Sequence, residues 1–412
     1  MKMVKMALFL FIFVIVAALL ASTIYYHNYT PKKLNIKPDE KALAFYRETY
    51  DDARALFRSN SDALAKRFNS VEKTMFKLPS KTDNDLSVDL LYIPAQKIKK
   101  GLVIISSGVH GVEGNVGSAL QAMLMQEFMT DEMLADTGFL FIHGINPYGF
   151  KYVRRTTENN IDLNRNCLAS PELYQTKNED YPQVIELINP QGKVKTRSME
   201  NIFFHLRSIK KIATASMPVL RQAVLQGQYE YPQGLYYGGA KPESQIVSVT
   251  PFIKKYSSGY RVVLNLDLHT GYGENGTAHL FTNPVTNPEV RQMMDKVFEG
   301  YKFDWGDTSD FYTITGDFTG YVGKIIDAKY LPMGIEYGTL DSQNTFGSII
   351  SLQRTLLENQ GYHHGYASEA DERRVKEMFR EMYYPSCTAW RTKVILDTKE
   401  MLTSALNKFK KL

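Results

Sequence analysis

The sequence predicts an α/β protein built on a doubly wound, mostly parallel mixed sheet with helices on both faces. Short apolar runs of strand length alternate along the chain with longer segments of helical periodicity. The chain has 412 residues, of which 44% are hydrophobic, so it can bury a large core. Polar side chains also follow two of the apolar runs, where open α/β sheets bind their ligands. Together these observations favour an α/β enzyme.

The first 26 residues are expected to be a membrane anchor. Lys2 and Lys5 precede an uncharged apolar run, Met6–Ile24. This run is longer than the roughly 7–15 residues of a cleavable signal and close to the roughly 20 that span a bilayer. Tyr25 and Tyr26 then suit a membrane interface. The alternative is a cleaved signal peptide. We expect an extracytoplasmic catalytic body, on the periplasmic side of the inner membrane if anchored and secreted if cleaved.

A polar linker, residues 27–38, leads to the expected catalytic domain, residues 39–412. From Asp39 to Phe68 the apolar spacing predicts an amphipathic helix with Asp39 as its N-cap. Residues from about 168 to 260 contain few strand patterns and are expected to form an insertion over the site. The other expected elements are strands at 74–78, 86–93, 102–106, 139–143, 262–268 and 333–335, and helices at 117–129, 202–225, 352–358, 369–381 and 389–409.

Charge and cysteine content exclude several classes of site. The net charge of +5 is small and dispersed, so nucleic-acid binding is not expected. Cys167 and Cys387 lie far apart without Cys-x-x-Cys spacing, so neither a thiolate zinc site nor a disulfide framework is indicated. We expect Cys167 to be an ordinary buried thiol, and one bridge between the two remains the alternative for an exported protein.

Three side chains predict a metal site. His110 and Glu113 follow the apolar run at 102–105, and His269 ends the run at 262–268. Two histidines and one glutamate are zinc ligands that leave a coordination position open, as catalytic zinc requires. Each has an ordinary alternative, because a lone histidine is more often a hydrogen-bonded core or surface residue, and Glu113 could simply favour a helix N-terminus. Their shared position at strand ends gives them a common meeting place.

Three further motifs lie between these strand ends: Asn146-Pro-Tyr-Gly-Phe150, Arg154-Arg155 and Asp162-Leu-Asn164-Arg165-Asn166. With the His-x-x-Glu pair and the distal histidine, this ordered series resembles the zinc carboxypeptidase superfamily over roughly residues 102–338. The Asp-Leu-His269-Thr-Gly segment is most similar to the succinylglutamate desuccinylase/aspartoacylase branch, and the full set to a bacterial branch. The resemblance implies a carboxypeptidase-like fold with one Zn²⁺ per chain, bound by His110, Glu113 and His269.

The resemblance also implies roles for the other motifs. Asn164 and Arg165 would hold a substrate carboxylate, for which the planar guanidinium is well matched. Either Arg154 or Arg155 would polarise the scissile carbonyl, and the short spacing to Asn164 leaves open which one. Tyr236 or Tyr237, in a Tyr- and Gly-rich segment, could be the tyrosine that closes over substrate in carboxypeptidases. The alternative is that this segment is a packed loop.

A glutamate late in the chain completes the expected site. Glu336 lies in Met-Gly-Ile-Glu-Tyr-Gly, and a strand glutamate at this position is the general base of the superfamily. A surface charge on an edge strand is the alternative, and Glu274 in a Gly-rich turn is the competing base. Asp267 precedes His269 by two residues on the same strand face, either orienting that histidine or supporting the core.

The predicted function is zinc-dependent amide hydrolysis, by a metallo-carboxypeptidase that acts on peptides. The alternative within the same class is an N-acyl amino acid deacylase of the aspartoacylase or desuccinylase type. A non-catalytic ligand-binding module is the alternative from a different class. The presence of all three ligands together with Glu336 favours an enzyme.

Overall fold

The computed structural model describes residues 2–215, 222–306 and 316–412. Within these residues an eight-stranded sheet has the order β1-β2-β4-β3-β5-β8-β6-β7. The central pairs β4-β3, β3-β5 and β5-β8 are parallel, and antiparallel pairs flank them, which confirms the predicted mixed sheet with a parallel centre. The strands are β1 Glu72–Lys77, β2 Ser87–Ile93, β3 Gly101–Ser107, β4 Thr137–His143, β5 Val262–Gly271, β6 Ala278–Phe281, β7 Phe303–Asp304 and β8 Lys329–Gly338.

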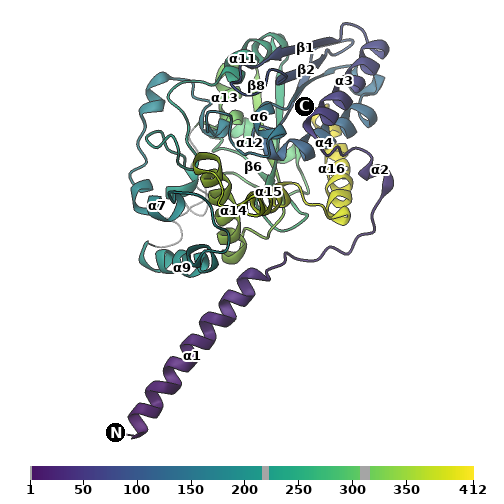
Figure 1. The fold of residues 1–412 in the computed structure, drawn as a ribbon. Coiled ribbons are helices and arrows are strands. Elements are labelled where there is room, and N and C mark those ends of the chain that lie inside the picture. The colour runs from purple at the N-terminus through teal and green to yellow at the C-terminus, as the bar shows by residue number, and fades with distance from the viewer. Residues whose placement is uncertain (1, 216–221, 307–315) are drawn as a thin grey trace.

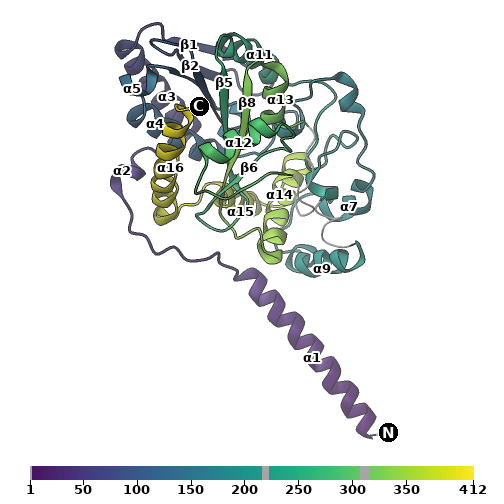
Figure 2. The same cartoon turned by 180° about the vertical axis from the view of Figure 1, so that it is seen from behind.

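The central strands are buried on both faces. Every residue of β3 and β4 is buried, as is typical of parallel strands covered by helices on both sides. Val103 and Ile105 of β3 pack in one cluster with α3, α4, α12 and α16. Leu102 and Ile104 point the other way and pack with α11 and α13. The predicted helices on both faces are therefore confirmed (Figures 1 and 2).

Among the described residues the α-helices lie before, between and after the strands. They are α1 Lys2–His27, α2 Glu40–Leu43, α3 Tyr50–Arg67, α4 Gly114–Glu127, α5 Asp131–Leu134, α6 Pro147–Lys151, α7 Tyr181–Ile188, α8 Met199–Ile202, α9 Phe204–Ala215, α11 Ser244–Ser257, α12 Pro288–Val297, α13 Phe318–Ile325, α14 Thr345–His364, α15 Glu369–Tyr383 and α16 Thr388–Phe409.

The helix predicted from Asp39 to Phe68 is two helices. Asp39 does cap the first, accepting a hydrogen bond from the backbone of Ala42, but α2 then ends at Leu43. Thr49 is extended and accepts from the backbone of Asp52, so it starts α3 as a second N-cap. The prediction of one helix was wrong because the apolar residues keep a helical spacing on both sides of the interruption before Thr49. The helix predicted at 202–225 is likewise divided between α8 and α9, and its residues 216–221 lie outside the described chain.

The segment predicted to be an insertion, about 168–260, divides into two structural parts. Its helices α7 and α9 pack with α14 in a cluster away from the sheet. Its last helix, α11, instead covers a sheet face through Ile246, Val249 and Ile253. The part that lies next to the site is therefore the earlier one, and α11 belongs to the layers of the sheet.

Helix α1 extends away from the body for most of its length (Figures 1 and 2). Its stretch Phe9–His27 has a mean hydropathy of 2.4 and is only 6% buried. By length and composition this helix could cross a membrane, although an N-terminal signal sequence would have the same character. Its C-terminal end contacts the body, where Tyr26 stacks on His205 with ring centroids 4.6 Å apart.

Candidate metal centre and its pocket

A sharp turn after β3 positions His110 and Glu113. Gly108 has a φ of +67°, and a Cβ there would lie 3.3 Å from the Cα of Gly144. His110 follows, and Glu113 ends the short 3₁₀ helix Gly111–Glu113. A Cβ on Gly111 would lie only 2.2 Å from the backbone of Gly149, so this turn packs directly on α6. The strand end and α6 together fix where the two side chains point.

The Asn-Pro-Tyr-Gly-Phe motif therefore supports the ligands from behind. Asn146 caps α6 by accepting from the backbone N–H of Gly149, and its amide donates to the carbonyl of Arg155. That carbonyl and the carbonyl of Arg154 accept from the backbone N–H groups of Gly111 and Val112, at 3.1 and 2.8 Å. The motif thus ties together the turn that carries the ligands and the arginine pair.

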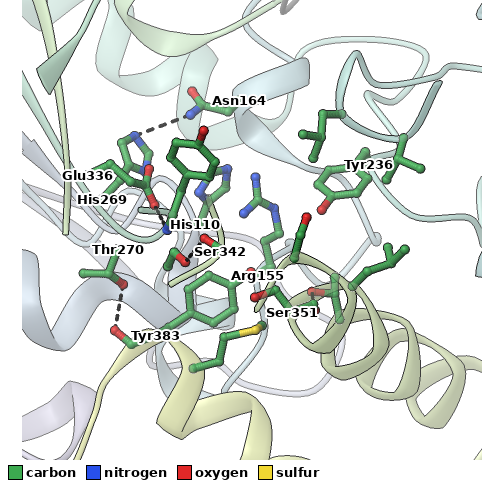
Figure 3. A pocket seen from close by; sticks show the side chains of 18 of the residues that line it. His110, Arg155, Asn164, Tyr236, His269, Thr270, Glu336, Ser342, Ser351 and Tyr383 are labelled. Carbon is green, nitrogen blue, oxygen red and sulfur yellow. Dashed lines mark hydrogen bonds between the residues drawn. The ribbon is translucent and has the colours of Figure 1, made fainter. Parts of the chain in front are cut away.

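The third ligand candidate and the candidate base lie on neighbouring strands. β5 and β8 are parallel and continue past the predicted strand ends, so that His269 and Glu336 fall within the strands rather than after them. Their register pairs His269 directly with Glu336. Side chains paired in this way project from the same face of the sheet. Both line the same pocket (Figure 3).

His110, Glu113 and His269 come together in the fold. The Nδ1 atom of His110 lies 2.9 Å from one carboxylate oxygen of Glu113, and the Nδ1 atom of His269 lies 2.8 Å from the other. All three residues are buried, and one ligand atom of each lies within 4.8 Å of the others. Two nitrogens and one oxygen converging on one point make a group that could hold a metal ion.

Two carboxylates hold the outer nitrogens of the histidines. Asp162 lies 3.2 Å from Nε2 of His110, and Asp267 lies 2.7 Å from Nε2 of His269. Ser106 donates to the other oxygen of Asp267 at 2.6 Å. Of the two roles considered for Asp267, the contact with His269 is the one present. A carboxylate on Nε2 keeps the proton there, so that the lone pair of Nδ1 faces the centre.

Charges within the buried cluster shift its pKa values strongly. Burial alone would raise the pKa of Glu113, but His110 and His269 lower it to about 2. Burial would lower the pKa of His269, yet Asp267 and Glu113 raise it well above its usual range. The cluster therefore stabilises positive charge between its carboxylates, which is the requirement for binding a cation.

Glu336 is a half-buried carboxylate at the edge of this cluster. Its Oε1 accepts from the backbone N–H of Tyr272 at 3.0 Å. Burial, reinforced by the carboxylate of Glu113, raises the pKa of Glu336 to about 7. Glu274, the competing base, pairs with Lys32 and has 43% of its side chain exposed, and it does not line the pocket. Only Glu336 of the two is near the candidate ligands.

The two adjacent arginines point in different directions. Arg155 lines the pocket, where its Nε donates to Asp162 at 2.9 Å and its guanidinium lies 5.2 Å from the ring centroid of Tyr236 (Figure 3). Arg154 is buried outside the pocket, beside Glu358 at 3.3 Å. The sequence left open which of the two arginines reaches the site. In the structure Arg155 is the one that lines the pocket.

Asn164 and Arg165 also line the pocket. The side-chain Oδ1 of Asn164 accepts from the backbone N–H of Phe318, and its side-chain amide nitrogen lies 3.4 Å from Nε2 of His269. In Arg165, Nε and one terminal nitrogen donate to the carbonyl of Leu225, and the other terminal nitrogen donates to the carbonyl of Asn164. These bonds fix the guanidinium at the pocket wall and leave one N–H on each terminal nitrogen for another acceptor.

The candidate tyrosines have separate positions. Tyr236 lines the pocket, with its ring near both Arg155 and Arg165 and its backbone at a φ of +56°. Tyr237 does not line it, and its carbonyl accepts from the backbone N–H of Asp162. The segment is therefore both a packed loop and the source of one pocket side chain.

The pocket, a cavity of about 210 Å³, has a polar and an apolar part. His110, Arg155, Arg165 and Glu336 line the polar part, around the candidate metal centre. The apolar part, called the apolar arm below, is formed by helices α7, α9 and α14 through Val184, Leu187, Ile188, Ile212, Ile349 and Leu352. None of these six residues was predicted from the sequence to line the site, and no helix was predicted at the position of α7.

Cys167 is buried and Cys387 exposed, and both are free thiols. The expectation of an ordinary buried thiol at Cys167 is confirmed.

The chain is similar in sequence to one protein family and in fold to several solved structures. The model of DUF2817, described as a protein of unknown function, matches residues 46–397. No curated protein matches the chain. Among solved structures, bovine thrombin-activatable fibrinolysis inhibitor in complex with tick carboxypeptidase inhibitor is 13% identical. That match covers 78% of this chain and 97% of the other, with a TM-score of 0.43.

Two further solved structures are similar at the same level. Carboxypeptidase A from Helicoverpa armigera is 14% identical, with 78% of its chain and 88% of this one covered and a TM-score of 0.40. A succinylglutamatedesuccinylase/aspartoacylase from Rhodobacter sphaeroides is 14% identical, with 65% of its chain and 72% of this one covered and a TM-score of 0.34. Their names are those of the superfamily and branch that the motifs resemble.

Proposed function

The chain belongs to the DUF2817 family, and we propose that it is a zinc-dependent hydrolase of amide bonds. The observation that carries the proposal is the convergence of three elements in one pocket. These are the His110–Glu113–His269 cluster, a half-buried glutamate of raised pKa and a fixed arginine. The first supplies ligands, the second a base and the third a positive charge.

The residues fit zinc. The donors are two Nδ1 atoms and one carboxylate, and Asp162 and Asp267 hold both imidazoles with their Nδ1 atoms toward Glu113. Three protein ligands of these types are typical of catalytic zinc, which leaves a further position for water or substrate. Zinc bound here would supply a Lewis acid that polarises a carbonyl group and makes water more acidic. We propose one ion per chain.

Glu336 is the proposed general base. A carboxyl group with a pKa near 7 can both accept a proton from water and release it again to the leaving nitrogen near neutral pH. The hydrogen bond from Tyr272 fixes one oxygen of Glu336. The other oxygen remains to contact the attacking water. A carboxylate with a strongly shifted pKa that lines a pocket on a central strand is typical of a functional group.

Arg155 is the proposed group that stabilises the negative charge on the carbonyl oxygen. Asp162 holds its Nε, so the terminal nitrogens are oriented before substrate arrives. A preorganised donor of this kind stabilises the transition state by about 2.7–4 kcal/mol. Arg154 has no such position, because it is buried beside Glu358.

Arg165 and Asn164 are proposed to hold a carboxylate of the substrate. The two free N–H groups of Arg165 match the two oxygens of a carboxylate. With Tyr236 between the two arginines, this end of the pocket suits a C-terminal residue, and the enzyme is then a metallo-carboxypeptidase acting on peptides. N-acyl amino acids carry the same carboxylate beside the same amide bond. The apolar arm favours N-acyl amino acids as a second candidate, because its six aliphatic side chains could contact an apolar acyl group.

We also propose that α1 remains on the mature protein as a membrane anchor and that the catalytic body lies outside the cytoplasm. The uncharged length of Phe9–His27 supports an anchor, as does the ordered contact of Tyr26 with the body, which a cleaved signal would not need.

A substrate screen tests the proposal. Zinc-loaded protein is incubated with peptides that have a free or an amidated C-terminus and with N-acyl amino acids, and released amines are quantified. We expect hydrolysis only next to a free carboxylate, and Arg165→Ala should lower kcat/KM for these substrates mainly through KM. Ligand binding without turnover by protein that contains zinc would support the non-catalytic module instead.

A further inference from the structure

The apolar arm is larger and more apolar than the proposed reaction requires. The bond to be cleaved, the carboxylate and the base are all accounted for by the polar part of the pocket. The arm adds side chains from three helices outside the sheet: Val184, Leu187 and Ile188 on α7, Ile212 on α9, and Ile349 and Leu352 on α14. An enzyme that hydrolysed only small polar amides would not need this apolar surface. An apolar ligand would bury it.

Two hydroxyl groups of α14 that line the pocket are turned toward their own helix, and the Ser208 hydroxyl of α9 is a buried polar group of the lining without a partner among the described residues. Ser351 donates to the carbonyl of Gly347 at 2.8 Å, and Thr355 donates to the carbonyl of Ser351 at 2.9 Å. Both bonds are internal to α14, so these side chains present mainly carbon to the pocket. An alkyl chain is the ligand chemistry that such a lining recognises, because it requires no hydrogen-bond partner.

The arm also lies against the end of α1. Tyr26 stacks on His205 of α9 and donates to Gln353 of α14 at 2.6 Å, and these two helices carry Ile212 and Leu352 of the arm. Figure 1 shows α9 and α14 at the side of the body from which α1 extends. With α1 as the proposed membrane anchor, the arm is therefore next to the bilayer surface, where molecules with long alkyl chains are concentrated.

We infer that the apolar arm binds a long alkyl chain on the acyl side of the scissile amide, so that the substrates are fatty-acylated amino acids or peptides. This inference rests on the proposed function, because it assigns the leaving amino acid, through its carboxylate, to Arg165. The acyl group is then the part of the substrate without a partner. Water adds to the amide carbon, the C–N bond breaks and the nitrogen takes a proton. The products are a fatty acid and an amine.

A chain-length series tests the inference. N-acetyl-, N-hexanoyl- and N-dodecanoyl-alanine differ only in the acyl group, so kcat/KM should rise with length by up to about fourfold for each methylene that the arm buries. Binding of the same compounds to zinc-loaded Glu336→Gln protein, measured by calorimetry, should follow the same order without any turnover. Equal kcat/KM and equal affinity across the series would overturn the inference. A preference for a long side chain on the amine, with none for the acyl chain, would also overturn it.

Variants locate the preference in the arm. Ser351→Phe places a ring in the arm, and Ile212→Asn places an amide there, so both should reduce the dodecanoyl-to-acetyl ratio in binding and in kcat/KM at least tenfold. The matched control is Thr403→Phe, at an exposed position of α16, where the threonine hydroxyl also donates to a carbonyl of its own helix. It should keep the wild-type ratio. An unchanged ratio in both folded arm variants would contradict the inference.

The outcomes separate this inference from the proposed function. If N-acetyl-alanine is hydrolysed as fast as N-dodecanoyl-alanine, the proposed hydrolase activity stands and the proposed alkyl-binding site is wrong. If binding increases with chain length in protein that hydrolyses none of the compounds, the alkyl-binding site stands and the proposed hydrolase activity is wrong.

Discussion

Individual side chains carry the proposed chemistry through their fixed partners. Glu336 accepts a hydrogen bond from the backbone of Tyr272, and Arg155 donates one to Asp162 and lies 3.8 Å from Glu113. Asp162 contacts both His110 and Arg155 and so connects the metal ligands with the arginine. It was visible in the sequence only as the first residue of a motif, and its role could be assigned only from the fold.

The first prediction concerns Glu336. Glu336→Gln preserves the shape of the side chain but removes the base, so zinc content should stay the same while kcat falls about 100- to 10,000-fold. Elemental analysis and kcat are measured on the same preparation. Turnover close to wild type in protein that contains zinc would assign the base to another carboxylate.

The second prediction separates the two adjacent arginines. Arg155→Gln should lower kcat about 100- to 1,000-fold in protein that remains folded, because a donor to the carbonyl oxygen is lost. Arg154→Gln should instead lower the free energy of unfolding by about 1–3 kcal/mol, because it breaks a buried contact with Glu358, which retains Lys376. Steady-state kinetics and urea unfolding on both variants check this. The reverse assignment of effects would refute it.

At the scale of elements, strand ends explain why much of the site could be predicted from the sequence. Apolar runs and the motifs after them located β3, β5 and β8, and parallel strands bring the residues near their carboxyl ends to one edge. The orientation of Arg154 and Arg155 could not be predicted, because it depends on Glu358 of α14 and on Asp162. The apolar arm depends on how α7, α9 and α14 pack together, and periodicity within one helix does not contain that information.

The third prediction concerns β4 and the two helices that cover it. His143 is fully buried, stacks on Phe57 of α3 and lies 3.1 Å from the hydroxyl of Ser118 of α4. Burial lowers its pKa to about 4, below the ordinary 6.5. As pH falls from 6.5 to 4, the unfolded chain gains a proton that the folded chain does not. Stability should therefore be full above pH 6.5 and decline by about 3 kcal/mol toward pH 4.

A variant isolates this contribution of His143. Urea unfolding of wild type and His143→Gln between pH 4 and 7.5 should give a smaller loss of stability on acidification in the variant, whatever its stability at neutral pH. Parallel curves for the two proteins would show that His143 does not contribute to the pH dependence.

The whole molecule combines an α/β body, a pocket at the edge of its sheet and an apolar helix that meets the body beside the pocket. Contacts of Tyr26 and Tyr29 with α14 and with the carbonyl of Leu340 tie this helix to the body. These contacts could not be predicted from the sequence, because they join residues more than 300 positions apart. They make the position of the helix relevant to access to the pocket.

The fourth prediction concerns this helix. N-terminal sequencing of the membrane fraction should find residues 1–26 retained, and protease added to spheroplasts should digest the body. A soluble protein that begins between Ala21 and His27 would show a cleaved signal, and protection of the body from external protease would place it in the cytoplasm.

The metal content of the purified protein tests the central claim most directly. Elemental analysis of the wild type should give one zinc per chain. His110→Ala and His269→Ala should lose it while remaining folded, because a catalytic ion contributes less to folding than a structural one. Glu274→Gln and His364→Ala, at positions outside the cluster, should keep it. Full zinc in His110→Ala and His269→Ala, or none in a wild-type protein supplied with zinc, would contradict the account.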